Sequence, residues 1–369
     1  MKLSKVIGVA ALAVALAAGL TSAPSAAAPP VRIKPSELPV GSAPQAAWLN
    51  QLDGTLRQPG QDPIALNAED AIAGSLFRAR SGWMVTYSWK SFWASHVRPD
   101  GRIERQGRGS IEVVSADGRS YVTSDLQYNS SADTFSTLMR QVRVSDGREL
   151  ARHRFPMPGS SGDVNALQMV GGRVLLEQSS YVGTRSRAIR GIRYSTMWWT
   201  PGTDKVSVLW RRTRTQQEDV IQSASSPSGR LVSVREGRTG QSVRSLRTHR
   251  QLWRLPLGEL AASFSPNGKV LMTVTRGIGP NEVRTLRARD ARTGRLQSTF
   301  RATLGAPFVQ AWESSKVFVA EAADRVKAGD DSLVGAALVR CSLRTVSCER
   351  VDAPVSARYA ERRGTSTGL

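Results

Sequence analysis

Short apolar runs alternate with tight-turn signals along most of this 369-residue chain. The clearest stretch covers residues 263–300. There, the turn Ser265-Pro266-Asn267-Gly268-Lys269 precedes the apolar run 270–274, a longer connection follows, and a turn at 290–294 joins two further runs. Runs bounded by Gly, Pro and Asn are typical of β-strands joined by hairpins. The pattern predicts a four-stranded antiparallel unit.

A second copy of this unit lies immediately upstream. The turn Ser226-Pro227-Ser228-Gly229-Arg230 precedes the apolar residues 231–234, and its glycine lies 39 residues before Gly268. A period near 40 residues, with turn glycines between short strands, predicts the blades of a β-propeller. A β-sandwich or two small all-β domains would be the alternative. Weaker copies are anchored at Gly82, Gly118, Gly172 and Ser315.

The predicted fold is therefore all-β, a single β-propeller of six or seven four-stranded blades. Residues 48–50 and 55–57 flank a turn at Asp53-Gly54, which predicts one more hairpin near the N-terminus. This hairpin either belongs to a seventh blade or completes the sixth, and we expect it to close the ring. The six clear units fall at 70–106, 111–155, 164–212, 220–256, 261–302 and 308–352.

Both ends of the chain differ from the repeating part. Lys2 and Lys5 precede an apolar run from Val6 to Leu20 and then small residues, so residues 1–27 are predicted to be a secretion signal. We expect a secreted or cell-wall-associated monomer with no membrane-spanning segment. The predicted parts are the signal peptide at 1–27, a Pro- and Ala-rich lead-in at 28–44, the propeller at 45–355 and a disordered tail at 356–369.

The chain has two cysteines, Cys341 and Cys348. In an exported chain, two close cysteines predict a disulfide. The pair flanks the expected tip of the last blade's outer hairpin, where the bond would keep the terminal hairpin from fraying. Two thiols without a nearby histidine fall short of a zinc ligand set, so we expect no metal there.

Aromatic residues concentrate in the first clear unit and again near residue 198. Two interpretations are open: a platform on which a sugar stacks, or packing between neighbouring blades. Packing is favoured, because buried aromatic rings are the common case. The residues concerned are Trp83, Tyr87, Trp89, Phe92, Trp93, Trp198 and Trp199.

The formal net charge is +21, and the basic excess is greatest in residues 181–254. A basic surface attracts polyanions such as anionic wall polymers, acidic lipid headgroups or extracellular nucleic acid. Alternatively, the arginines are compositional and only solvate the surface. No nucleic-acid-binding motif is present, so we expect no specific nucleic-acid partner. The candidate polyanion patch, expected in two neighbouring loops, is Arg185, Arg187, Arg190, Arg193, Arg211, Arg212 and Arg214.

No catalytic constellation can be assembled from the sequence. The three histidines, His96, His153 and His249, are isolated and show no metal-ligand spacing. The Gly-x-Ser-x-Gly pattern at 364–368 lacks the strand and helix of a nucleophile elbow. The acidic residues at 321–331 fit no calcium loop. We therefore assign no catalytic residue, cofactor or metal.

The turns at 265–269 and 290–294 resemble those of WD40-like and TolB-like propeller repeats. Those families carry a Ser-Pro-Asp-Gly-Arg-type turn between inner strands and an Asp-x-x-Thr-Gly-type turn in the outer hairpin. The chain is also similar to exported propellers of actinobacteria, many of which end in a disulfide hairpin. The good match covers residues 220–302, and the Gly-His and Trp-Asp dipeptides of true WD40 repeats are missing. The resemblance implies a scaffold for binding and carries over no catalytic residue.

Three functional hypotheses are compatible with the sequence. The first is a non-catalytic exported propeller that binds an envelope or extracellular protein, or an anionic wall polymer, through its loops. The second is an enzyme, a lyase or hydrolase with a site in the central channel. The third is a basic surface protein that binds polyanions, which salt would release. The absence of clustered histidines in the sequence favours the first.

Overall fold

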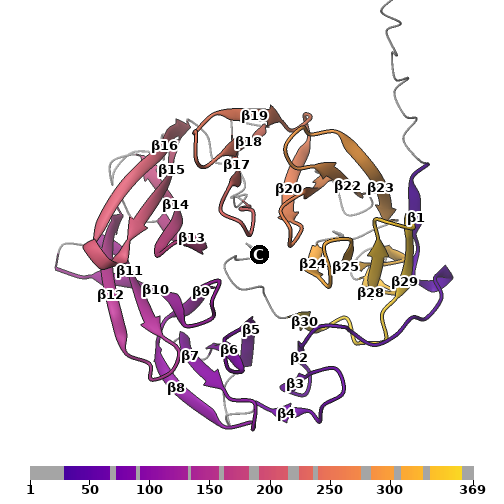
Figure 1. The fold of residues 1–369 in the computed structure, drawn as a ribbon, viewed down its shortest axis with the longest axis horizontal. Helices are drawn as coiled ribbons and strands as arrows, with labels where there is room; N and C mark the ends of the chain where they lie inside the picture. The colour runs from indigo at the N-terminus through magenta and orange to yellow at the C-terminus, as the bar shows by residue number, and fades with distance from the viewer. Residues whose placement is uncertain are drawn as a thin grey trace, which may run out of the picture.

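The chain forms a ring of seven β-sheets around a central axis in the computed structural model (Figure 1). Each sheet is one blade, and the strand nearest the axis is its inner strand. The structure describes residues 29–66, 72–88, 92–131, 134–157, 162–182, 191–214, 224–235, 240–275, 284–302, 309–326 and 333–359. The predicted signal peptide therefore lies outside the described residues.

The blades are numbered in chain order, and their strands are given from the axis outward. Blade 1 is β30 (Ala357–Tyr359), β2 (Trp48–Asn50), β3 (Thr55–Arg57) and β4 (Ile64–Ala65). Blade 2 is β5 (Ile72–Arg78), β6 (Trp83–Ser88), β7 (Phe92–Val97) and β8 (Ile103–Arg108). Blade 3 is β9 (Ser110–Val114), β10 (Ser120–Asn129), β11 (Thr134–Arg143) and β12 (Glu149–Met157). Blade 4 is β13 (Gly162–Val170), β14 (Arg173–Val182), β15 (Gly191–Thr200) and β16 (Lys205–Arg214).

The remaining blades show small departures from this plan. Blade 5 is β17 (Leu231–Arg235), β18 (Gln241–Ser245) and β19 (Gln251–Arg254), and an isolated bridge from Ser225 to Val232 marks the inner position. Blade 6 is β20 (Glu259–Phe264), β21 (Val270–Thr275), β22 (Arg284–Asp290) and β23 (Leu296–Ala302), with β1 (Val31–Ile33) added outside. Blade 7 is β24 (Val309–Trp312), β25 (Val317–Ala322), β28 (Ala337–Ser342) and β29 (Ser347–Arg350). A small hairpin, β26 (Arg325–Val326) with β27 (Leu333–Val334), and two 3₁₀ turns, Pro35–Glu37 and Pro201–Thr203, complete the described elements.

The structure has seven blades, so the count of six is wrong and the alternative of seven is correct. The six predicted units correspond to blades 2 to 7. The N-terminal hairpin β2–β3 forms its own blade with β30, which comes from the other end of the chain. Residues 357–359, predicted to be part of a disordered tail, form the strand β30, because β2 offers them backbone hydrogen-bond partners.

The repeated turns explain why the blades share one geometry. Gly268 has φ of +67°, which places it in the left-handed region that favours glycine. The Ser265 backbone N–H donates to the Val270 carbonyl at 2.8 Å, and the Asn267 side chain accepts the Lys269 N–H at 3.0 Å. Gly229 repeats the conformation with φ of +65° in blade 5. The recurring turn therefore has a direct conformational cause.

The hydrophobic core lies between blades. Phe300 of blade 6 packs edge-on against Phe318 of blade 7, with ring centroids 5.2 Å apart, and both are fully buried. Leu49 and Leu56 of blade 1 share a cluster with Val85 of blade 2. Each blade thus buries its faces against its neighbours, which is what closure of the ring provides.

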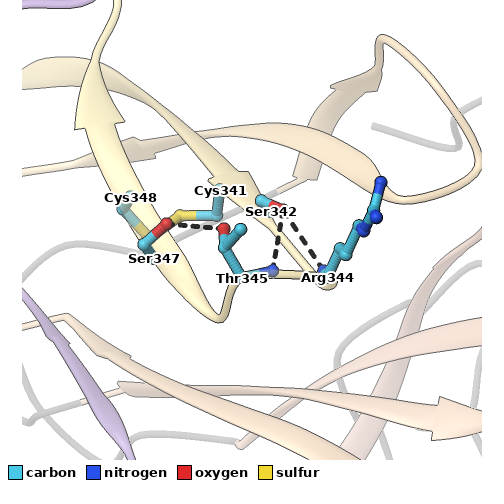
Figure 2. The surroundings of a disulfide bond; sticks show 6 residues. All are labelled: Cys341, Ser342, Arg344, Thr345, Ser347 and Cys348. Carbon is cyan, nitrogen blue, oxygen red and sulfur yellow. Dashed lines mark hydrogen bonds between the residues drawn. A yellow bond between two sulfur atoms is a disulfide. The ribbon is translucent and has the colours of Figure 1, made fainter.

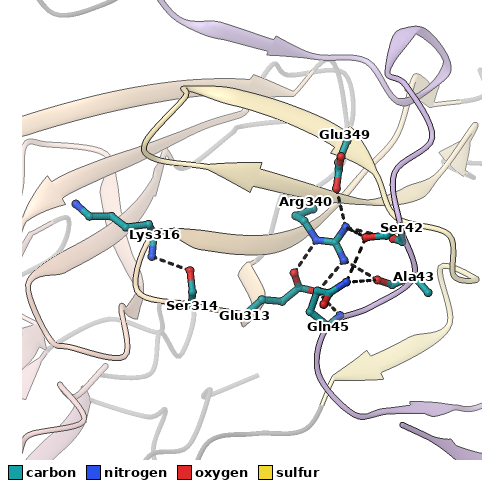
Figure 3. A network of polar contacts seen from close by, with 8 residues as sticks. All are labelled: Ser42, Ala43, Gln45, Glu313, Ser314, Lys316, Arg340 and Glu349. Carbon is teal, nitrogen blue, oxygen red and sulfur yellow. Dashed lines mark hydrogen bonds and ion pairs between the residues drawn. The ribbon is translucent and has the colours of Figure 1, made fainter. Parts of the chain in front are cut away.

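A stretch that we call the N-terminal strap, residues 31–45, runs along the outside of blades 6 and 7. Its strand β1 pairs in parallel with β23, Val31 opposite Phe300. Further along, the Arg340 guanidinium donates to the Ala43 carbonyl at 2.8 Å and forms ion pairs with Glu313 and Glu349 (Figure 3). Burial alone would lower the pKa of Arg340, but the two carboxylates raise it above its ordinary value. The predicted lead-in is therefore ordered from Pro29 onward by contact with the propeller.

The predicted disulfide is present. Cys341 on β28 lies directly opposite Cys348 on β29, with Cα atoms 4.1 Å apart (Figure 2). The bond joins the two outer strands of blade 7, next to the turn at 343–346. Cys341 is fully buried, so its sulfur belongs to the core between blades 6 and 7.

Candidate interaction surfaces

Strand direction gives the ring two different faces. Because the strands within a blade are antiparallel, the connections from first to second strand and from third to fourth strand lie on one face, the turn face. Connections from second to third strand, and from one blade to the next, lie on the other, the loop face. The turn face is built from short turns such as 115–119 and 265–269, whereas long connections such as 183–190 begin and end at the loop face. Segments between strands commonly carry binding residues, so each face is a candidate surface.

The structure places the described part of the arginine patch at the loop face of blade 4. Arg193 lies near the start of β15 opposite Thr213, and Arg211 is exposed on β16 opposite Ser195. Arg212 and Arg214 lie at the end of the same strand. These three residues therefore belong to the outer edge strand rather than to a loop, which corrects the sequence analysis. Arg185, Arg187 and Arg190 lie outside the described residues.

Exposed apolar side chains gather at the loop face. Among the described residues, twelve large apolar side chains are exposed. Seven of them occupy loop-face connections or the strand ends beside them: Leu52, Phe92, Leu126, Tyr128, Leu257, Leu333 and Val355. Leu52 and Leu257 are the most exposed, at 80% and 82%.

Blade 3 extends one hairpin beyond its inner strand at this face. β10 and β11 pair from Ser120 to Asn129, but β9 pairs only with Tyr121 to Ser124. Leu126 and Tyr128 share one side of the extension by strand alternation. The Tyr128 ring lies 4.8 Å from the Phe135 ring, and Tyr128 is 55% exposed. The extension therefore offers an apolar strip to solvent.

The aromatic residues of the first clear unit pack between blades, as favoured. Trp83 and Tyr87 are buried in the cluster shared with blade 1, and Trp198 and Trp199 are buried in blade 4. Trp93 lies between the Tyr87 ring, stacked at 5.5 Å, and the Arg105 guanidinium at 4.9 Å. These rings do not form a sugar platform. Phe92 is exposed at the loop face, and Trp89 lies outside the described residues.

One carboxyl group near the axis has a strongly shifted pKa. Glu112 lies on β9, where its carboxylate accepts hydrogen bonds from the Ser124 hydroxyl and from the backbone N–H of Ala166 on β13. Burial, reinforced by the charge of Asp163, raises the pKa of Glu112 to about 7. A carboxyl group with a pKa near 7 can exchange a proton at neutral pH. Sequence reasoning missed Glu112, because its surroundings come from two blades.

The three histidines remain apart. His153 on β12 pairs through Nδ1 at 2.8 Å with Asp204 in the turn before β16, whereas His96 is buried in blade 2 and contacts the Ser81 carbonyl. Within the described ranges, no group of three or more His, Cys, Asp or Glu side chains is arranged to hold a metal ion. None of the helices in the described part has the length and apolar character needed to cross a bilayer.

Fold and surfaces together define the class of protein: a seven-bladed β-propeller with exposed apolar side chains at its loop face. No protein-family model matches the chain, and no curated protein matches it. Solved structures do match. An uncharacterized protein, lmo1340, from Listeria monocytogenes EGD-e has a TM-score of 0.50 at 11% identity, covering 77% of this chain and 83% of that one.

Two further matches have lower TM-scores. An oligogalacturonate lyase in complex with manganese has a TM-score of 0.49 at 10% identity, over 82% of each chain. TolB from Acinetobacter baumannii has a TM-score of 0.40 at 16% identity, over 69% of this chain and 65% of that one. At such identities the likeness concerns the fold alone.

Proposed function

We propose that this protein is an exported, non-catalytic scaffold that binds an envelope or extracellular protein at its loop face. The observation that carries the proposal is the gathering of exposed apolar side chains there, among connections of varied length. Apolar side chains exposed on a folded surface lose contact with water when a partner covers them, which favours association. Beneath this face, buried apolar clusters join neighbouring blades.

The exported location rests on two features. The first is the charged start followed by the apolar run Val6 to Leu20, and the second is the disulfide of blade 7. Disulfides persist in oxidising compartments, outside the cytosol. Both features support an extracellular or envelope location for the partner as well.

The strip on blade 3 provides the test. Co-sedimentation of the purified protein with insoluble envelope material is compared at low and high salt. The variant Leu126→Ser/Tyr128→Ser should lose the retention that survives high salt, because the strip can no longer bury apolar area. The matched control is Leu150→Ser/Leu252→Ser, which changes two exposed apolar side chains at the turn-face ends of β12 and β19. Equal retention of the two variants would overturn the proposal.

A second candidate function rests on Glu112. A carboxyl group with a pKa near 7 beside the inner strands could act as the general acid or base of a lyase or hydrolase with a site in the channel. Activity on an anionic polysaccharide that falls at least a hundredfold in Glu112→Gln, with unchanged folding, would favour this enzyme over the scaffold. The absence of such activity from the unaltered protein would remove it.

A further inference from the structure

The turn face carries an exposed basic residue at an equivalent position in several blades, and none of these residues belongs to the arginine patch. In blades 3 to 7, the turn from the inner strand to the second strand ends in a basic residue, and all five of these residues are exposed. We call them the turn-face ring: Arg119, Arg173, Arg230, Lys269 and Lys316. Each stands at the start of its second strand, so one cation appears per blade at the inner part of this face.

Hydrogen bonds hold the backbone of four of the five residues, Arg119, Arg230, Lys269 and Lys316, on both sides. The Arg119 N–H donates to Asp117 Oδ1 at 3.1 Å, and the Lys316 N–H donates to Ser314 Oγ at 3.2 Å. On the other side, the carbonyl of Arg119 accepts the Val144 N–H at 2.9 Å. The carbonyls of Arg230, Lys269 and Lys316 accept equivalent bonds from Leu246, Ala291 and Leu343. The same turn geometry therefore places these residues at equivalent positions in their blades.

Neighbouring turns also touch one another. The Arg80 N–H of blade 2 donates to the Gly118 carbonyl of blade 3 at 2.9 Å. Gln168 of blade 4 donates to the Ser226 carbonyl of blade 5 at 2.6 Å. A Cβ built on Gly268 of blade 6 would lie 3.5 Å from that of Ser226. The turns that carry the cations consequently follow one another around the axis, and contacts join those of blades 5 and 6.

A second arc of cations lies outside the first. The turns from third to fourth strand in blades 2 to 6 each place an exposed basic residue after a residue of positive φ. These are Arg102, Arg148, Lys205, Arg250 and Arg295. Acids are present in these outer turns. The inner turns of blades 3 to 7 contain Asp117, which pairs with Arg119, and Glu313, which pairs with Arg340. Both arcs are therefore lined by exposed cations.

We propose that the turn-face ring binds a flexible linear polymer that carries a phosphate group in each repeat. Single cations spaced along an arc match a chain with regularly spaced charges, because each contact neutralises one group and releases one counterion. Most of the cations in both arcs are arginines, whose planar guanidinium suits phosphate oxygens. This surface is separate from the loop face. Binding of a polymer here is therefore a further function that does not depend on the scaffold function.

The test uses long-chain inorganic polyphosphate with a fluorescent end label. The ring variant is Arg119→Gln/Arg230→Gln/Lys269→Gln/Lys316→Gln, which spares Arg173 because that side chain stacks 4.7 Å over Trp198. The patch variant, Arg185→Gln/Arg187→Gln/Arg190→Gln/Arg211→Gln, removes the same charge elsewhere. We expect affinity to fall roughly tenfold or more in the ring variant only. Each phosphate contact with a flexible strand contributes ~0.7 to the slope of log Kd against log salt. The loss of four contacts should therefore make this slope shallower by about 3.

Three results would overturn the proposal. Equal losses in both variants would mean that net charge alone drives binding, and a larger loss in the patch variant would place the polymer at the loop face. Equal affinity of the unaltered protein for polyglutamate would remove the selectivity for phosphate. Circular dichroism and thermal melting of both variants check folding, which the substitutions at the exposed residues of the turn-face ring should leave intact.

Discussion

Trp48 lies directly opposite Tyr359 in the antiparallel pair of β2 and β30, although almost the whole chain separates them. Tyr359 is 4% exposed and Ala357 is fully buried. Burial raises the pKa of the Tyr359 phenol above its ordinary value, as expected of a side chain enclosed between blades. The two ends of the chain thus share one blade, and their pairing closes the propeller.

Removal of β30 should open the ring. A chain that ends at Val355 loses the burial of Tyr359 and the hydrogen bonds of three strand residues, and we expect the free energy of unfolding to fall by about 3 kcal/mol or more. Urea denaturation followed by tryptophan fluorescence measures it. A chain that ends at Tyr359 is the control and should keep the stability of the unaltered protein. Equal stability of the two truncated chains would contradict this role of β30.

Glu259 holds two arginines of blade 6 in place. Its carboxylate is 2% exposed and contacts Arg289 at 2.7 Å and Arg287 at 2.6 Å. Burial alone would raise the pKa of Glu259, but hydrogen bonds from Arg289 and Thr273 lower it. Glu259→Gln should cost about 3 kcal/mol at neutral pH, because it leaves these guanidinium groups without a countercharge.

The pH dependence gives Glu259 a distinct signature. A carboxylate with a lowered pKa stabilises the fold above its ordinary pKa, and this stability is lost as the pH falls through the folded pKa. The cost of Glu259→Gln should therefore shrink in acid, as measured by urea denaturation at several pH values. Glu104→Gln, which removes a partly exposed pair with Arg98, should cost at most about 1 kcal/mol. A pH-independent cost at Glu259 would refute the ionic explanation.

Glu112 should show the opposite pH dependence. Its pKa rises from 4.5 to about 7 on folding, so the folded protein keeps a proton that the unfolded chain releases in that window. The free energy of unfolding should then fall as the pH rises from 4.5 to 7, by about 2 kcal/mol since the side chain keeps some contact with water. In Glu112→Gln this decline should disappear. A decline of equal size in the variant would assign it to other groups.

The disulfide should stabilise blade 7 by a modest amount. A crosslink over a sequence separation of 7 residues restricts the unfolded chain by about 2.5 kcal/mol on the chain-entropy account. Reduction with dithiothreitol should lower the free energy of unfolding by about that amount. The Cys341→Ala/Cys348→Ala variant supplies the control, because its stability should not respond to dithiothreitol.

Blades 2 to 7 were predictable from local sequence patterns. Turns such as Ser265 to Lys269 need a left-handed residue and a side-chain acceptor at fixed positions, and this local requirement is visible as a repeat. The pairing of Cys341 with Cys348 was equally predictable, because both lie on one hairpin. Local hydrogen bonding and local geometry therefore made the fold class and most strand positions predictable from the sequence.

The blade count and the surfaces depend on contacts between segments that are distant in sequence. Three residues at 357–359 have no periodicity of their own, and they become a strand because β2 offers unpaired backbone groups. Arg211 lies on the edge strand of blade 4, burial and the charge of Asp163 in the next blade raise the pKa of Glu112, and the basic residues of the turn-face ring lie along one arc. Each of these depends on contacts between segments distant in sequence, which closure of the ring alone brings together.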